Sequence, residues 1–253
     1  MNTIDAAVLG PVSHDEAMAL QEAELARTLE ALAGLEPDDW DAATDCPDWD
    51  VRAMYLHVLG ACEAGASMKE NVHQLRAARK HRKLEGGPLE AALSAVQISD
   101  RVSVEPDALV ARLRAVAPRT VRGRRRTPSV VRNHAKLSID GPVHETWTMG
   151  YLIDTIYLRD LWMHRVDLSR ATARELSLTS EHDGRIVADV VGEWARRHGQ
   201  PFVLELTGAA GGQFAQVPDS SNAESLEMDA VEFCRTLAGR RSANGLMSTV
   251  VPF

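Results

Sequence analysis

The chain has 253 residues, with 28 Lys and Arg against 36 Asp and Glu, and therefore a formal net charge of −8 at pH 7. This balance argues against a nucleic-acid-binding protein, because neutralisation of phosphates by basic side chains supplies most of the affinity of such proteins. Hydrophobic residues make up 45% of the chain and charged residues 25%, as in an ordinary globular protein. The composition therefore excludes a chain that is disordered as a whole.

The sequence indicates a protein of the cytoplasm. Its first ten residues lack the basic and apolar regions of a signal peptide, and no stretch reaches the roughly 20 apolar residues of a membrane-spanning helix. The three cysteines, Cys46, Cys62 and Cys234, are widely spaced and form no C-x-x-C pair. Neither a disulfide framework nor a thiolate zinc site is therefore expected, and a reducing compartment fits best.

Four helices are predicted in the first two thirds of the chain. Apolar residues recur there at helical spacing, and residues suited to helix starts precede them, namely Ser13, Asp50 and Pro106. The helices are expected over residues 13–35, 51–80, 105–116 and 149–173, with a long polar connection over 118–143. This arrangement is typical of a four-helix bundle.

A change of pattern near residue 175 predicts a second, smaller unit. One helix is expected over residues 177–199, a hairpin over 201–217, a short strand over 225–228 and a last helix over 229–240. We therefore predict an α+β protein of two domains. The first is a helical bundle at residues 1–175, and the second is a small α/β domain at residues 176–253.

Asp160 and His164 are four residues apart in the last predicted bundle helix and therefore share one face of it. That face is otherwise apolar, and two lone polar groups are costly to bury unless they share a partner such as a cation. His57, on a small and apolar face of the second helix, is the best candidate for a third ligand. Three protein ligands leave one position of a tetrahedral metal open, as in catalytic sites.

Other interpretations of these residues remain open. A buried Asp-x-x-x-His pair can be satisfied by hydrogen bonds alone, without a metal. Asp167, on the same side of the helix, can orient an imidazole or can form an ion pair with Arg165 or Arg170. Spacing alone does not decide between these roles.

Further motifs carry less weight. His144 and Glu145 begin a zincin-like pattern, but Thr148 stands where the second histidine is required. The glycines near residue 210 lack the Lys and Ser or Thr of a phosphate-binding loop, so a hairpin turn is expected. A basic cluster is formed by Arg119, Arg122, Arg124, Arg125 and Arg126. This cluster can bind an anionic substrate or a thiol cofactor, or it can be part of a solvated loop.

The segment from Cys46 to Arg52, followed by His57 and Gly60, resembles the first motif of the mycothiol-dependent maleylpyruvate isomerase family, a branch of the DinB-like metalloproteins. Residues 159–172 resemble the second motif of that family, and residues 237–241 and 251–253 resemble its C-terminal domain. The resemblance implies an up-and-down four-helix bundle that holds a divalent metal, usually zinc. The implied ligands are His57, Asp160 and His164, with Asp160 in place of the Glu of the characterised isomerases.

The implied function is that of a metal-dependent enzyme that uses a low-molecular-weight thiol. Mycothiol is the thiol that the resemblance indicates, and isomerisation or S-transfer on a small electrophile is the reaction. A metal lowers the pKa of a thiol, ordinarily about 8.5, and the thiolate can then attack the electrophile. The alternatives are a protein that binds a metal or a small molecule without turnover, and a metal-dependent hydrolase. Neither nucleic acid nor a membrane is an expected partner.

Overall fold

A computed structural model describes residues 3–140, 144–217 and 223–253 of the chain. It forms two compact units. The larger unit is His14–Arg174, and the smaller unit consists of the residues up to Ser13 together with Glu175–Phe253. Within the described ranges, no helix is both long and apolar enough to cross a membrane.

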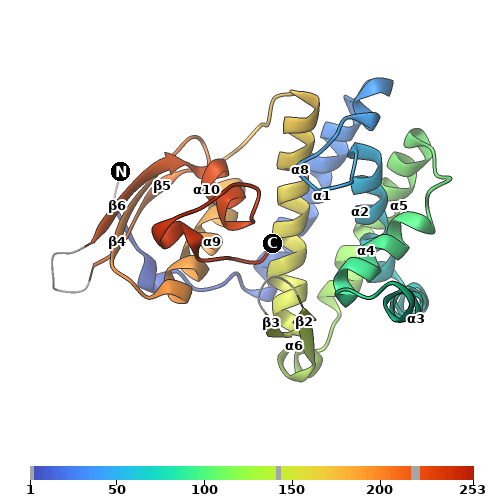
Figure 1. The fold of residues 1–253 in the computed structure, drawn as a ribbon, viewed down its shortest axis with the longest axis horizontal. Coiled ribbons are helices and arrows are strands. Elements are labelled where there is room, and N and C mark those ends of the chain that lie inside the picture. Colours follow the sequence, from blue (N-terminus) through green and yellow to red (C-terminus); the bar gives the residue numbers. More distant parts are fainter. Residues whose placement is uncertain (1–2, 141–143, 218–222) are drawn as a thin grey trace. The chain divides into compact units, whose positions relative to one another are not determined.

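The larger unit is a four-helix bundle (Figure 1). Helix α1 packs against α5 and α8, and α2 packs against the same two helices. Their facing sides are apolar and bury Met18, Met54, Leu109 and Trp162 among others. The predicted bundle is thus confirmed, with α1 at His14–Ala33, α2 at Val51–Ala66, α5 at Pro106–Arg125 and α8 at Tyr157–Thr172.

The second predicted helix is two helices in the structure, α2 and α3 (Met68–Glu85). Ser67 lies between them in an extended conformation, with φ −145° and ψ 116°, and its hydroxyl accepts a hydrogen bond from the backbone N–H of Glu70. The prediction of one helix over residues 51–80 was therefore wrong, because apolar periodicity does not reveal a break of one residue at a capping serine. Helix α3 packs against α4 (Leu89–Ser99), which the sequence did not predict.

Much of the predicted connection over residues 118–143 is regular structure. Helix α5 continues through Pro118, although a proline inside a helix costs about 3 kcal/mol. Packing against α2 offsets this cost, and the hydroxyl of Thr120 donates a hydrogen bond of 2.7 Å to the carbonyl of Cys62. Residues 141–143 lie outside the described ranges. The other elements here are α6 (Ser129–His134) and an antiparallel hairpin of β2 (Lys136–Asp140) and β3 (His144–Thr148).

The predicted helix over residues 149–173 is continuous and contains a π-helical turn. It starts as α7 (Met149–Tyr151), widens at Leu152–Ile156 and continues as α8. The side chain of Gln21 on α1 donates a hydrogen bond of 2.7 Å to the carbonyl of Ile153 within the π turn. This contact ties the widened turn to α1 just before α8, the helix that carries Asp160 and His164.

The smaller unit is a four-stranded sheet in the order β1-β5-β4-β6 with two helices. Strands β4 and β5 form the predicted hairpin, and Trp194 packs on Phe202 and Phe233 with ring centroids 4.7 and 5.4 Å apart. The elements are β1 (Ile4–Asp5), α9 (Asp183–His198), β4 (Phe202–Thr207), β5 (Gly212–Gln216), β6 (Glu224–Asp229) and α10 (Ala230–Leu237).

Strand β1 corrects the predicted division of the chain. Ile4 and Asp5 pair in parallel with Phe214 and Ala215 of β5. The segment before His14 therefore belongs to the smaller unit, and its assignment to the bundle at residues 1–175 was wrong. A strand of two residues has too little periodicity to be recognised in the sequence.

Candidate metal centre

Helices α2 and α8 bring the three predicted ligands together. Nε2 of His57 lies 3.8 Å from Oδ2 of Asp160, and Nε2 of His164 lies 3.2 Å from Oδ1 of the same carboxylate. The two imidazole rings are 5.5 Å apart between centroids and nearly perpendicular, at 82°. One ligand atom from each of the three residues lies within 4.8 Å of the other two. A single cation can therefore contact all three side chains.

One buried imidazole nitrogen tests whether these residues fit a metal. Nε2 of His164 is buried and makes no hydrogen bond of good geometry in the described part of the chain, although Oδ1 of Asp160 lies 3.2 Å away. A buried polar atom without a partner costs about 1–3 kcal/mol, a cost that a coordinated cation removes. Two imidazoles and one carboxylate are also a donor set typical of catalytic zinc. The residues thus fit a divalent metal.

The charges of Asp160 and His164 are strongly coupled. Burial would lower the pKa of His164, but the charge of Asp160, together with the hydrogen bonds of His164 to Asp160, Asp167 and Cys46, raises it well above 6.5. Burial would raise the pKa of Asp160, but the charge and hydrogen bond of His164, followed by those of His57, lower it well below 3.8. Without a metal, the site holds a proton on His164 beside a carboxylate. A divalent cation bound to these residues would have to displace that proton.

Asp167 and Cys46 lie at the opposite edge of the His164 ring. Oδ2 of Asp167 is 3.5 Å from Nδ1 of His164, and the Asp167 side chain is fully buried. The Cys46 thiol donates a hydrogen bond of 3.5 Å to the same carboxylate oxygen and lies 3.9 Å from Nδ1. Asp167 is therefore placed to orient the imidazole of His164.

The two arginines considered as partners of Asp167 contact other carboxylates. Arg165 donates to Glu24 on α1 from Nε at 2.6 Å and from Nη2 at 3.1 Å, and this ion pair is buried. Arg170 donates from Nε to Asp45 at 3.1 Å, near the surface.

The loop before α2 forms one wall of the centre. Thr44 and Trp49 close this loop, because the backbone N–H and the hydroxyl of Thr44 both donate to the carbonyl of Trp49, at 3.1 and 2.8 Å. The indole of Trp49 lies 5.1 Å from the ring of His57 and 6.3 Å from that of His164. Sequence reasoning missed that Cys46 and Trp49 face the centre, since periodicity carries no information about side-chain directions in a loop.

Four of the five arginines of the predicted basic cluster lie on helix α5 rather than in a loop, and Arg126 is the C-cap of this helix. Arg124 is buried, with Nη1 donating a hydrogen bond of 2.8 Å to Gln21 on α1 and with Cζ 4.0 Å above the ring of Tyr157 on α8. This arginine therefore holds three bundle helices together. The other four arginines of the cluster are exposed.

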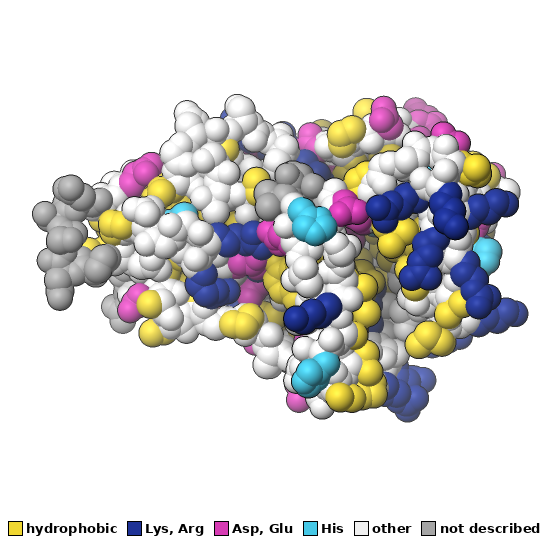
Figure 2. Space-filling model, turned by 60° about the horizontal axis from the view of Figure 1, so that its bottom comes forward, with side chains coloured by type: hydrophobic (Ala, Val, Ile, Leu, Met, Phe, Trp, Pro, Cys, Tyr) yellow, Lys and Arg dark blue, Asp and Glu magenta, His cyan; other side chains and the backbone are white. Residues whose placement is uncertain are grey.

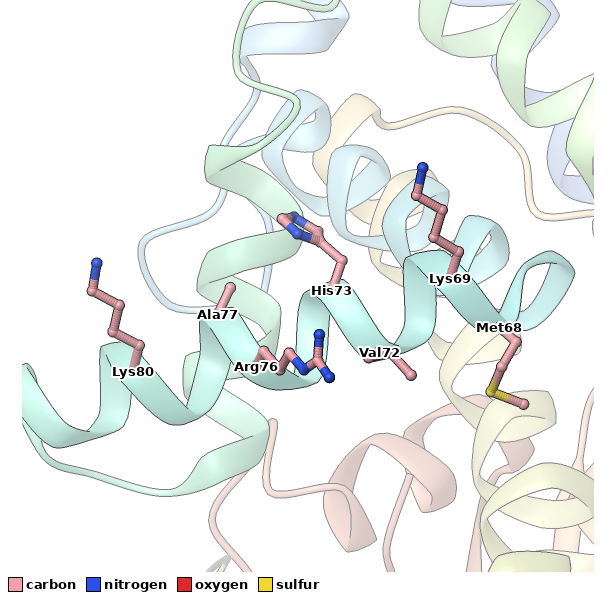
Figure 3. A pocket seen from close by; sticks show the side chains of 7 residues that line it. All are labelled: Met68, Lys69, Val72, His73, Arg76, Ala77 and Lys80. Carbon is pink, nitrogen blue, oxygen red and sulfur yellow. The ribbon is translucent and has the colours of Figure 1, made fainter.

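Helix α3 carries a separate groove of about 570 Å³. Lys and Arg side chains gather on the right of Figure 2, towards the end of the bundle that carries α3, and this helix contains six of them against two glutamates. The close view in Figure 3 shows side chains of one face of α3, and none of the three candidate ligands is among them. The lining residues are Met68, Lys69, Val72, His73, Arg76, Ala77 and Lys80.

Comparison with known proteins agrees with the fold. A solved structure of the mycothiol-dependent maleylpyruvate isomerase is 16% identical, with a TM-score of 0.58 over 96% of this chain and 94% of that chain. A variant of that enzyme with a histidine replaced by alanine is 17% identical, with a TM-score of 0.55 over 96% and 93%. No curated protein matches the chain. The family model for the mycothiol maleylpyruvate isomerase N-terminal domain matches residues 21–169, which is more than half of the chain and includes all three candidate ligands, and the chain therefore belongs to this family.

Proposed function

We propose that the protein is a metal-dependent enzyme that uses mycothiol, a low-molecular-weight thiol, for isomerisation or S-transfer on a small electrophile. The observation that carries the proposal is the cluster of His57, Asp160 and His164, whose ligand atoms lie within 4.8 Å of one another and in which Nε2 of His164 is buried without a well-formed hydrogen bond. Family membership supports the thiol, because the solved relatives are described as mycothiol-dependent.

His57, Asp160 and His164 would hold the metal, and zinc suits these donors. A divalent metal bound there lowers the pKa of a thiol, so that the thiol reacts as a thiolate near neutral pH. Asp160 contributes one negative charge and the neutral imidazoles none, so the three side chains balance only part of a divalent charge. This charge balance favours an anionic thiolate as the fourth partner of the centre.

Two neighbouring residues support the ligands. The Asp167 carboxylate accepts a hydrogen bond from the N–H at Nδ1 of His164, so that in the neutral imidazole the lone pair of Nε2 faces Asp160 and the centre. The indole of Trp49 covers one side of the imidazoles and limits the access of water. Asp160, where the characterised isomerases have Glu, shortens the carboxylate arm, so the proposal names a class of electrophile rather than maleylpyruvate.

The test replaces the metal with cobalt and titrates the protein with mycothiol. Thiolate coordination to cobalt produces a charge-transfer band in the near ultraviolet, and we expect this band together with mycothiol-dependent turnover on a panel of electrophiles. An unchanged spectrum with hydrolysis of an ester or amide in the absence of thiol would replace the proposal with a hydrolase. A band without turnover of any electrophile would indicate a protein that only binds the metal and the thiol.

A further inference from the structure

We infer that Cys46 is a positioning residue of the metal centre, an inference that rests on the proposed function because it requires a metal at the three ligands. Its thiol holds the carboxylate of Asp167, and this carboxylate in turn holds Nδ1 of His164. The Cys46 side chain thereby acts on the metal through two other side chains, without contacting the substrate.

The direction of each hydrogen bond follows from the chemistry of the groups. An ionised carboxylate can only accept hydrogen bonds, so Oδ2 of Asp167 accepts from both the S–H of Cys46 and the N–H at Nδ1 of His164. With its proton at Nδ1, a neutral His164 has its lone pair at Nε2, the atom that faces Asp160. Cys46, Asp167 and His164 are 7%, 0% and 4% exposed, so water has little access to replace any of these contacts.

The backbone around Cys46 is fixed on both sides of the thiol. The N–H of Cys46 donates to the hydroxyl of Thr44 at 3.1 Å, and its carbonyl accepts from the N–H of Trp49 at 3.2 Å. Asp48, between them, adopts the left-handed conformation with φ 65°, which Asp tolerates better than most residues. The loop therefore places Sγ from a rigid frame, as a positioning role requires.

A second arrangement of the same atoms is the main rival to this role. Ligand atoms of Cys46, His164 and Asp167 also lie within 4.8 Å of one another, so this group could itself hold a metal. A metal there would use Nδ1 of His164 and a Cys46 thiolate. The S–H donor to Asp167 would then be lost, so the two arrangements predict different metal spectra.

The experiment measures metal affinity by competition with a chelator for the wild type, Cys46→Val and Cys46→Ser. Valine fills a similar volume without a donor, whereas serine keeps a donor in a smaller side chain. We expect Cys46→Val to weaken metal binding about tenfold, the lower end of the effect of losing an outer partner of a ligand, and Cys46→Ser to stay within about threefold of the wild type. Cys234→Ala, at a buried cysteine of the smaller unit, is the control and should leave the metal affinity unchanged.

The outcomes separate the possibilities. Equal metal affinity in the wild type and Cys46→Val would overturn the inference. So would a loss of metal affinity in Cys46→Ser as large as that in Cys46→Val, because it would show that the volume of the side chain matters and its hydrogen-bond donor does not. If the valine variant does not fold, Cys46→Ala removes the same donor without adding volume. A thiolate band in the cobalt protein before any thiol is added, lost in Cys46→Ser, would show Cys46 as a ligand instead. If the wild type binds no metal, the proposed function itself is contradicted.

Discussion

Nε2 of His164 lies 3.2 Å from Oδ1 of Asp160, one turn earlier on α8, and the imidazole and the carboxylate shift each other's pKa in opposite directions. The pair is mostly enclosed, and His57 approaches the second oxygen of Asp160 from α2. In the proposed metal site, a proton and a metal ion would therefore compete for Nε2 of His164, so metal binding would depend on pH.

Replacing His164 with Ala should remove the metal, because two remaining ligands and an open cavity hold a divalent ion poorly. Metal content of the purified protein, measured by elemental analysis, checks this expectation. His73→Ala is the matched control, since His73 on α3 is exposed and pairs with Asp100 at 2.9 Å. Stoichiometric metal retained in a His57→Ala, His164→Ala double variant would contradict the assignment.

The metal-free protein should lose stability as the pH rises above 6.5, the ordinary pKa of histidine. The folded pKa of His164 is raised, so its charged form stabilises the fold fully below 6.5, and this contribution disappears as the pH passes the raised value. Denaturant unfolding of the metal-free wild type and His164→Gln at several pH values tests this sign. The stability difference between the two proteins should shrink with rising pH, and a constant difference would refute the coupling.

Metal binding should depend on pH in the opposite sense. Because the metal must displace the proton of His164, affinity should rise with pH over the same range, and the chelator competition described above measures this slope. Affinity that falls as the pH rises would exclude His164 as a ligand.

Gly123→Ala should destabilise the bundle and weaken metal binding. A Cβ at Gly123 on α5 would clash with the backbone carbonyl oxygen of Gly65 on α2, and backbone cannot move aside as a flexible side chain can. We expect a loss of about 1–3 kcal/mol in the free energy of unfolding, together with a shift of α2, which carries His57. Gly34→Ala is the control, because its Cβ would meet only the carbonyl of Ala31 at 3.6 Å. Equal stability of the two variants in thermal unfolding would contradict this prediction.

The arginine cluster on α5 should not bind nucleic acid. The net charge of the chain is −8, and Arg124 is committed to Gln21 and Tyr157 inside the bundle. The exposed arginines have no interleaved aromatic residues on which bases would stack. Filter binding of DNA and RNA at low and moderate salt should therefore show no specific retention. Tight, salt-sensitive binding that is lost in an Arg122→Ala, Arg125→Ala, Arg126→Ala variant would overturn this expectation.

Helical geometry explains which parts of the site could be predicted. Within a helix the spacing of two residues fixes their relative direction, so Asp160, His164 and the nearby Asp167 could be placed on one side from the sequence alone. Cys46 could not be placed, because its direction depends on a left-handed residue and on three hydrogen bonds of the loop. Loop geometry of this kind leaves no periodic trace in the sequence.

The same reasoning applies to the fold. The long apolar periodicity of α1 and α8 predicted these helices well, since their buried faces follow one helical repeat. The break at Ser67 and the passage of α5 through Pro118 depend on tertiary packing, which overrides local preference. The small sheet was predicted only in part, because the partner of β1 comes from the other end of the chain.

The parallel pairing of Ile4 with Phe214 has a consequence for the order of events on the ribosome. A nascent chain completes His14–Arg174 well before β5 is synthesised, and domains generally fold in the order in which they emerge. His57, Asp160 and His164 have thus all been synthesised before β5, the strand that pairs with β1. If these residues bind a metal as proposed, the growing polypeptide can bind the ion during translation, and the sheet that joins the two ends of the chain forms last.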